Sequence, residues 1–288
     1  MVIYMKKNAF IFVSISFLCV TFFTLLPLLY SFGMTFFSGR GNELVFSGFD
    51  NYTRILEDKT FIKALQNTLF FAILIPPLVL VTSVYLANLI NKITNRRFRS
   101  FITTVIYLPS IVSPVAYSFF FRRFFAVDGF LNTLLMYLGL LKEQQNFLLT
   151  PTGARIAIIM ICLWAWTGYY TVLILSSYQH INPLLYKSGQ LDGANSVQTF
   201  MYITLPTIKP VVLFSSILLF GGIFQLISEI MIVSRGGPEE STLTLAYYVY
   251  RLSFEYAPQF GYATTISLII LFFSLVTTII QYLMRGKQ

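Results

Sequence analysis

One acidic residue lies inside an otherwise apolar span and is well placed to bind a polar molecule. Glu229 falls in the span 211–233. An ionisable side chain inside a membrane span is costly and usually faces protein or water, so it marks a candidate solute pathway. Along a continuous helix Gln225 would share its face, and the glycines one turn earlier leave room beside the backbone. We predict a pathway lined by residues of this span: Gly222, Ile223, Gln225, Ser228 and Glu229. Pairing of Glu229 with an outer-loop arginine for a structural reason is the alternative.

A second candidate for solute contact is an aromatic face in the span 156–178. Trp166, Tyr169 and Tyr170 are three and four residues apart and so share one side of a helix. Aromatic rings suit sugars, because sugar C–H faces stack on them while the hydroxyls form hydrogen bonds. Since 17% of the chain is aromatic, a packing or lipid-facing stripe is the alternative.

Patterns for catalysis or for metal binding are absent from the sequence. His180 is the single histidine, and both cysteines, Cys19 and Cys162, lie in apolar spans. No G-x-x-x-x-G-K-[ST] motif occurs, so the chain cannot hold a nucleotide phosphate by that route. We expect no catalytic residue, no metal site and no cofactor in this chain.

Composition indicates an all-α integral membrane protein. The chain is 56% hydrophobic and 11% charged, against about 25% charged in a soluble domain. Six apolar stretches have the roughly 20 residues that a bilayer-spanning helix needs. We predict one membrane domain, 1–288, with spans at about 9–32, 68–90, 101–121, 156–178, 211–233 and 264–284.

Basic residues predict the orientation of these spans. A cleaved signal peptide is the alternative for the first span, but its apolar stretch is longer than a signal core and no A-x-A site follows. With the N-terminus inside, lysine and arginine are about twice as dense in the inner segments (1–8, 91–100, 179–210, 285–288) as in the outer ones. The positive-inside rule then places both termini in the cytoplasm. The net charge of +9 reflects this rule and contact with anionic lipid, not nucleic-acid binding.

The loop 179–210 is the most ordered polar segment of the chain. Asn182 is a candidate N-cap with Pro183 at the first helical position, and that helix would end near Asp192. Gly193 can adopt the left-handed conformation that terminates a helix. Asn195 with Gln198 resembles a capping box for a second short helix, which Leu205 and Pro206 would stop. Two short helices joined at a glycine form a stiff projection.

The spacing within this loop resembles that of membrane subunits of ATP-binding-cassette (ABC) importers. Their cytoplasmic loop reads E-A-A, three residues, G, nine residues, I, x, L-P, and Gly193, Ile203, Leu205 and Pro206 match the last part. Tyr186 and the Asp192–Ala194 stretch look like the sugar-importing branch. The E-A-A triplet itself is replaced here by Lys187, Ser188 and Gly189, which reverses the charge at one position.

The resemblance extends over nearly the whole chain. SRGGPEEST (234–242) looks like the TxGGPxxxT stretch of sugar-type permeases, and YYVYRLSF and FGYATTIS follow in the same order. GFDNYTRIL and ALQNTLFFA look like the family's first outer loop and second span. The likeness is to the larger membrane subunit of maltose-type and glycerol-phosphate-type importers of the binding-protein-dependent family.

This resemblance implies a type I ABC importer permease in a prokaryotic cell membrane. Its partners would be a second permease, two copies of an ABC ATPase that binds ATP-Mg, an extracellular solute-binding protein, a sugar and membrane lipid, with no nucleic acid. It implies that the loop docks on the ATPase through Lys187, Ser188, Gly189, Asp192, Gly193 and Ala194, with Phe200 as an apolar plug beside Leu205 and Pro206. The alternatives are a secondary carrier driven by an ion gradient, a membrane scaffold, and a loop that packs only on its own bundle.

Overall fold

A computed structural model describes residues 14–41 and 43–284 of the 288. The chain forms two compact units, one made of Met1–Ile62 with Tyr248–Leu271 and one made of Lys63–Tyr247 with Phe272–Gln288. The predicted start of the first span at 9–13 and both predicted cytoplasmic ends, 1–8 and 285–288, lie outside the described residues. All the residues proposed above for coupling or solute contact belong to the second unit.

The first unit combines an exposed apolar helix with a small sheet. The helix Ser14–Met34 contains the π turn η1 (Thr21–Leu25) and α2 (Leu26–Met34). Strands β1 (Phe37–Ser38) and β2 (Val45–Phe46) pair antiparallel, and α3 (Asp50–Glu57) follows. Gly261 lies so close to the backbone of Phe37 and Met34 that a side chain would collide with it, which explains a glycine there.

A carboxylate organises the polar part of this unit. Asp58 Oδ1 accepts hydrogen bonds from the backbone N–H groups of Thr60 (2.9 Å) and Phe61 (3.1 Å), which caps the following helix. Asp58 Oδ2 accepts from the hydroxyls of Tyr248 (2.7 Å) and Tyr262 (2.6 Å). Burial raises the pKa of Asp58, but these hydrogen bonds together lower it below its usual value.

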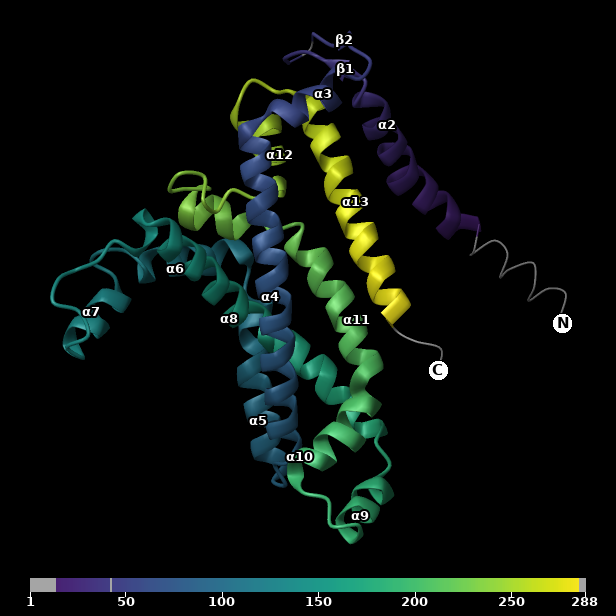
Figure 1. Cartoon of the computed structure of the whole chain (residues 1–288), viewed down its shortest axis with the longest axis vertical. Coiled ribbons are helices and arrows are strands. Elements are labelled where there is room, and N and C mark those ends of the chain that lie inside the picture. Colours follow the sequence, from purple (N-terminus) through teal and green to yellow (C-terminus); the bar gives the residue numbers. More distant parts are fainter. Residues whose placement is uncertain (1–13, 42, 285–288) are drawn as a thin grey trace, which may run out of the picture. The chain divides into compact units, whose positions relative to one another are not determined.

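The remaining elements follow in chain order (Figure 1). They are α4 (Lys59–Asn91), α5 (Arg96–Tyr107), η2 (Leu108–Ile111), α6 (Pro114–Phe124), α7 (Phe130–Tyr137), η3 (Phe147–Leu149), α8 (Pro151–Ser177), η4 (Tyr178–His180), α9 (Pro183–Leu191), α10 (Ser196–Thr199), η5 (Phe200–Thr204), α11 (Leu205–Ile223), η6 (Ile230–Ser234), α12 (Leu245–Tyr250), η7 (Arg251–Glu255) and α13 (Phe260–Met284).

The predicted all-helical membrane architecture is confirmed, with two departures in the spans. Five described helices are long and apolar enough to cross a bilayer, and the third predicted span is a pair, Arg96–Ile111 and Pro114–Phe124, bent by 93°. Pro109 and Pro114 flank the bend, where they cannot donate helical hydrogen bonds. The pair Pro76 and Pro77, by contrast, lies inside the uninterrupted α4, which begins nine residues before the predicted 68.

The fifth predicted span, 211–233, is also not continuous. Helix α11 ends at Ile223, and the chain resumes helical structure only just before η6. The helix end closes with hydrogen bonds that span three residues instead of four, from Gln225 N–H to Gly222 O and from Leu226 N–H to Ile223 O. Thr244 Oγ1 then donates to Leu226 O at 2.9 Å, which satisfies a carbonyl freed by the break.

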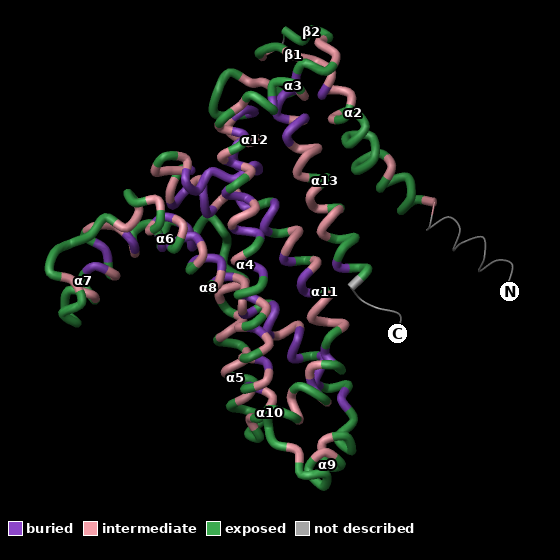
Figure 2. Tube along the Cα trace, in the orientation of Figure 1, coloured by how far each residue is buried: buried purple, intermediate pink, exposed green. Residues whose placement is uncertain are grey.

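Helix α8 is the central element of the second unit. It packs against α5, η2 and α11, and twelve of its residues are buried (Figure 2). Gly168 lies against the backbone carbonyl of Ile106 so closely that a β-carbon would not fit. The close approach of the end of α5 to α8 therefore depends on that glycine.

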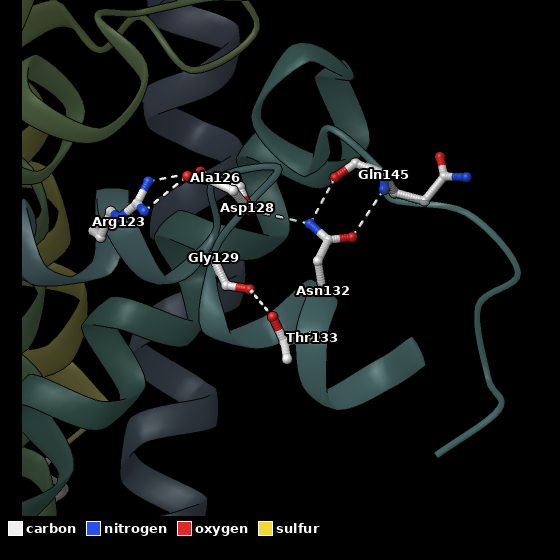
Figure 3. Close-up of polar contacts among 7 residues, drawn as sticks. All are labelled: Arg123, Ala126, Asp128, Gly129, Asn132, Thr133 and Gln145. Atoms are coloured by element: carbon white, nitrogen blue, oxygen red, sulfur yellow. Dashed lines mark hydrogen bonds and ion pairs between the residues drawn. The ribbon is translucent and has the colours of Figure 1, made fainter. Parts of the chain in front are cut away.

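The segment after α6 folds around a buried asparagine (Figure 3). The Asn132 side chain donates to Ala126 O (3.1 Å) and Gln145 O (2.8 Å) and accepts from Gln145 N (2.8 Å). Nearby, Arg123 and Asp128 form a two-bonded ion pair at 2.6 and 2.8 Å. Its exposed carboxylate has a lowered pKa, chiefly because Arg123 donates hydrogen bonds to it. These bonds hold α7 to the end of α6.

Candidate functional site

The first arm of the loop 179–210 forms as its sequence predicts. Asn182 is the N-cap of α9, and its side chain accepts from the Leu184 N–H at 3.0 Å. Pro183 occupies the first helical position, where its missing donor costs nothing. The helix ends at Leu191, and Gly193 adopts φ +74°. The Ala194 N–H then returns to Gly189 O at 2.8 Å, which closes the helix end.

The second arm starts as predicted but does not stop where predicted. The capping box between Asn195 and Gln198 is present in both directions. However, the helix runs without interruption from Ser196 to Ile223, so the expected stop at Leu205 and Pro206 is wrong. Pro206 therefore lies inside a continuous helix, directly after the π turn η5. Its missing N–H leaves a carbonyl of the preceding turn without the usual helical donor.

The two arms are joined to each other by close contacts. A β-carbon on Gly189 would lie 2.9 Å from Cδ1 of Ile203, so α9 and η5 approach through that glycine. The hydroxyls of Tyr186 and Thr204 form a hydrogen bond at 3.1 Å. Sequence reasoning used Tyr186 and Ile203 only as markers of the motif. Their packing role could not be read from spacing alone.

An apolar cluster lies directly beneath these arms. Its buried members come from α4, α8, η4 and α11 and the residue after η4: Ala87, Ile90, Ile174, Leu175, Tyr178, Ile181 and Ile208. Tyr186, Ile203 and Leu205 of the loop pack against it. A force on the loop is therefore transmitted to several helices at once, because packed interiors do not deform easily.

The surface of the loop carries most of the predicted coupling residues. Lys187, Ser188, Asp192 and Gly193 are exposed, whereas Gly189 and Ala194 are half-buried. The exposed apolar residue at the turn is Leu191, which is 89% exposed and was not predicted. Single exposed apolar residues are ordinary on protein surfaces, so it is the place of Leu191 at the turn that makes it a candidate contact.

Phe200, the predicted apolar plug, does not project from the loop. It is half-buried and lines two grooves beside α4, together with Asn88 and Lys92. Its predicted role as a plug remains a prediction. Leu191 is the better exposed candidate.

Glu229 is buried, and its partner is a tyrosine. Its side chain is 4% exposed and accepts a hydrogen bond from the hydroxyl of Tyr117 on α6. Trp166 on α8 lies beside that tyrosine. The alternative pairing of Glu229 with an outer-loop arginine is therefore wrong. The structure joins two predicted pathway residues, Trp166 and Glu229, through Tyr117, which sequence reasoning missed.

The break after Ile223 separates the other predicted pathway residues. Gln225 is exposed, and its side chain donates to Gly221 O at 3.3 Å. It does not share a helical face with Glu229, because no continuous helix connects them. Gly222 is exposed, Ser228 is half-buried and Ile223 is buried. A site that used all five residues would need a rearrangement of this break.

The predicted aromatic face is partly open. Tyr169 is 40% exposed and packs edge-on against the buried Tyr170, with ring centroids 5.0 Å apart. Trp166 is half-buried in the contact with Tyr117. Only Tyr169 of the three therefore presents a large ring surface outward.

Among the described residues, no group of three or more His, Cys, Asp and Glu side chains could hold a metal ion. Cys162 is buried and Cys19 is exposed.

Comparison with known proteins decides the family. A family model described as "Binding-protein-dependent transport system inner membrane component" matches residues 79–287. The chain belongs to this family. The lactose transport system permease protein LacF of Rhizobium radiobacter is 35% identical over 281 residues, which cover 97% of this chain and 94% of LacF. The arabinooligosaccharides transport system permease protein AraP of Bacillus subtilis (strain 168) is 28% identical over 99% of this chain and 90% of AraP.

Solved structures share the fold of this permease. A subunit of a bacterial ABC transporter involved in the import of the acidic polysaccharide alginate aligns with a TM-score of 0.84 and 25% identity, covering 97% of this chain and 96% of that one. A subunit of an amino acid ABC transporter aligns with a TM-score of 0.51 and 14% identity, covering 82% of this chain and 97% of that one, and shows the fold alone.

A second polar network of the permease holds the segment Ser234–Thr242. The buried Asn67 on α4 donates to Glu240 O (2.6 Å) and Leu243 O (3.0 Å). Arg155 on α8 donates to Ser241 O (2.9 Å) and to the Asn67 side chain (3.0 Å). The sequence identified this segment only by its resemblance to the family. Asn67 and Arg155, which hold it, are 88 positions apart.

Proposed function

We propose that this permease is a transmembrane subunit of an ATP-driven importer for oligosaccharides or related sugars. With a second permease it would form the translocation pathway, and it would couple to a separate ATPase through residues 183–204. The whole chain, 1–288, would act as one permease domain. The observation that carries this proposal is the loop itself, whose two arms are tied together and packed on a cluster that reaches α4, α8 and α11.

Relatives support a carbohydrate as the substrate. The names of LacF, AraP and the diacetylchitobiose permease NgcF of Streptomyces coelicolor all specify saccharides. Another solved alginate transporter is in complex with an alginate pentasaccharide-bound periplasmic protein. Tyr169 offers an exposed ring for stacking, and Gln225 and Ser228 offer hydrogen-bonding groups near the break.

The partners follow from this function. Two copies of an ABC ATPase would bind ATP-Mg and hydrolyse it, since this chain has no phosphate-binding motif of its own and would not be an enzyme. An extracellular binding protein would deliver the sugar. The permease would lie in the cell membrane of a prokaryote with both termini cytoplasmic, as the density of basic residues predicts.

Transport would proceed by alternating access. Closure of the ATPases would move the loop, and the packed cluster would pass that motion to three helices. The break after Ile223 and the bend between α5 and α6 are the places where the second unit can change shape without unfolding a helix. An ion-gradient carrier has no support from the family or its relatives.

Capture of the ATPase on the tagged permease tests this function. Extraction of the complex in mild detergent should retain an ABC ATPase, and Leu191→Asp should lower that retention at least tenfold. Burying a leucine contributes about 1.5–3 kcal/mol to such an interface, and each 1.4 kcal/mol is tenfold in affinity.

Leu140→Asp is the matched control, since Leu140 is 68% exposed in the segment between α7 and η3. It should leave the ATPase bound. Equal loss in both variants, or a permease that carries no ATPase at all, would contradict the proposal.

A further inference from the structure

The proposed function does not use a polar groove between α5 and α8. The groove has a volume of about 590 Å³. Its polar lining comes from α5 and from the end of α8 with η4: Arg96, Arg99, Ser100, Thr103, Thr104, Ser176 and Gln179. Gln179 is three residues before Asn182, so the groove lies where α8 leads into the loop.

The groove carries positive charge without a balancing acid. The segment 91–100 has four basic residues and no acidic one. Neither Arg96 nor Arg99 takes part in the ion pairs Arg123–Asp128 and Arg251–Glu255 of the described residues. Arg99 is nevertheless half-buried. A partly desolvated guanidinium is stabilised by an anion at hydrogen-bonding distance.

The donors of the groove suit a phosphate group. A guanidinium presents a planar fork that matches phosphate oxygens. The hydroxyls of Thr104 and Ser176 donate to their own helices, at Ser100 O (3.0 Å) and Leu173 O (2.7 Å), which leaves their oxygens as weak acceptors. The Gln179 amide has no hydrogen bond within the described structure and is exposed at the rim, so it is free to donate.

The surroundings of the groove favour a lipid over a soluble anion. Val172 and Leu175 form an apolar part of the lining. Phe98 and Phe101, in the first two turns of α5, are 53% and 62% exposed. Basic residues together with exposed phenylalanines are typical of helices at the boundary between headgroups and acyl chains. Basic pockets between membrane helices are known sites for anionic headgroups.

We propose that this groove binds the phosphodiester headgroup of an anionic phospholipid. Arg96 and Arg99 hold the phosphate, Gln179 donates to it from α8, and the acyl chains lie along α5 past Phe98 and Phe101. Bound lipid therefore joins α5 to the end of α8, next to the loop. Lipid binding does not depend on the proposed transport function. That function, through the orientation of the chain, only places the bound lipid in the cytoplasmic leaflet of the membrane.

Lipid titration of the purified full-length permease tests the site. In neutral detergent, native mass spectrometry would count bound dioleoylphosphatidylglycerol. The comparison is zwitterionic dioleoylphosphatidylcholine, whose choline cation offsets the charge of its phosphodiester. The wild-type chain should bind the anionic lipid at least tenfold more tightly. Arg99→Gln should weaken that binding tenfold or more, because a charge-assisted hydrogen bond is lost.

Arg97→Gln is the matched control. It removes the same charge from the same helical turn, but Arg97 does not line the groove. It should weaken binding less than threefold. Equal effects of Arg97→Gln and Arg99→Gln would show bulk attraction to a charged surface and overturn the site.

Two further measurements separate the remaining outcomes. Gln179→Glu places a carboxylate at the exposed rim, where folding is not at risk, and should abolish preference for the anionic lipid. Inorganic phosphate at the same concentration should not displace the lipid. Displacement by phosphate, or a wild-type chain that binds both lipids equally, would refute the proposal.

Discussion

Replacing Tyr117 with phenylalanine removes the side-chain donor to a carboxyl group that is 4% exposed. The substitution keeps the ring and its edge-on contact with Trp164, whose centroid is 6.0 Å away. Loss of a hydrogen bond to a buried acceptor costs about 1–3 kcal/mol. We expect Tyr117→Phe to lower the thermal midpoint of the detergent-solubilised chain by on the order of 5 °C.

Substitutions of Glu229 test the same hydrogen bond from its acceptor side. Glu229→Gln keeps an oxygen that can accept from Tyr117, so it should cost less than about 1 kcal/mol. The double variant Tyr117→Phe with Glu229→Leu removes both polar partners and should recover much of the loss, since neither group is then left unpaired. Tyr137→Phe, at a site 87% exposed, controls for loss of a hydroxyl.

The result that refutes this reasoning is a Glu229→Gln variant as unstable as Tyr117→Phe. It would mean that the charge of Glu229, and not its hydrogen bond, holds η6 against α6. Thermal melting followed by tryptophan fluorescence suffices, because both tryptophans, Trp164 and Trp166, lie beside this network.

Two other substitutions have outcomes set by the structure. Gly189→Leu should push α9 away from Ile203 at an overpacking cost of about 1–3 kcal/mol. It should lower sugar-stimulated ATP hydrolysis about tenfold, while sugar binding by the partner binding protein stays normal. Unchanged hydrolysis would contradict a coupling role for the contact between α9 and η5. Asp58→Ala should destabilise the first unit by at least about 1 kcal/mol, because the helix loses its cap. Folding lowers the pKa of Asp58. The stability that the carboxylate contributes is therefore present above its unfolded pKa of about 4 and is lost as the pH falls through the folded pKa. Melting curves of Asp58→Ala and wild type should therefore converge at low pH, and a constant difference between them at all pH values would show that the carboxylate is not the cause.

Local features of the loop could be predicted because their causes are local. The caps at Asn182 and Asn195 and the turn at Gly193 depend on residues within three or four positions, so their sequence patterns are sufficient. The π turn before Pro206 was not predictable in this way. A single extra residue in the hydrogen-bond register leaves no mark in hydrophobic periodicity.

Contacts between distant residues could not be predicted. Tyr117 and Glu229 are 112 positions apart, and Asn67 meets Leu243 across 176. Glu229 was recognisable as unusual because burial of an acid is costly, but nothing in its neighbourhood named a tyrosine as its partner. The break after Ile223 was not predicted, since the glycines before it were interpreted only as room beside a continuous helix. The carbonyl that the break frees is satisfied by Thr244, whose position depends on the fold.

The most direct test of the transport account is sugar uptake into liposomes that contain this permease, its second permease and its ATPase. Uptake of a labelled oligosaccharide should require ATP inside, the binding protein outside and an intact loop, and Leu191→Asp should abolish it. Uptake by this chain alone, driven by an ion gradient and indifferent to ATP and to Leu191, would contradict the account.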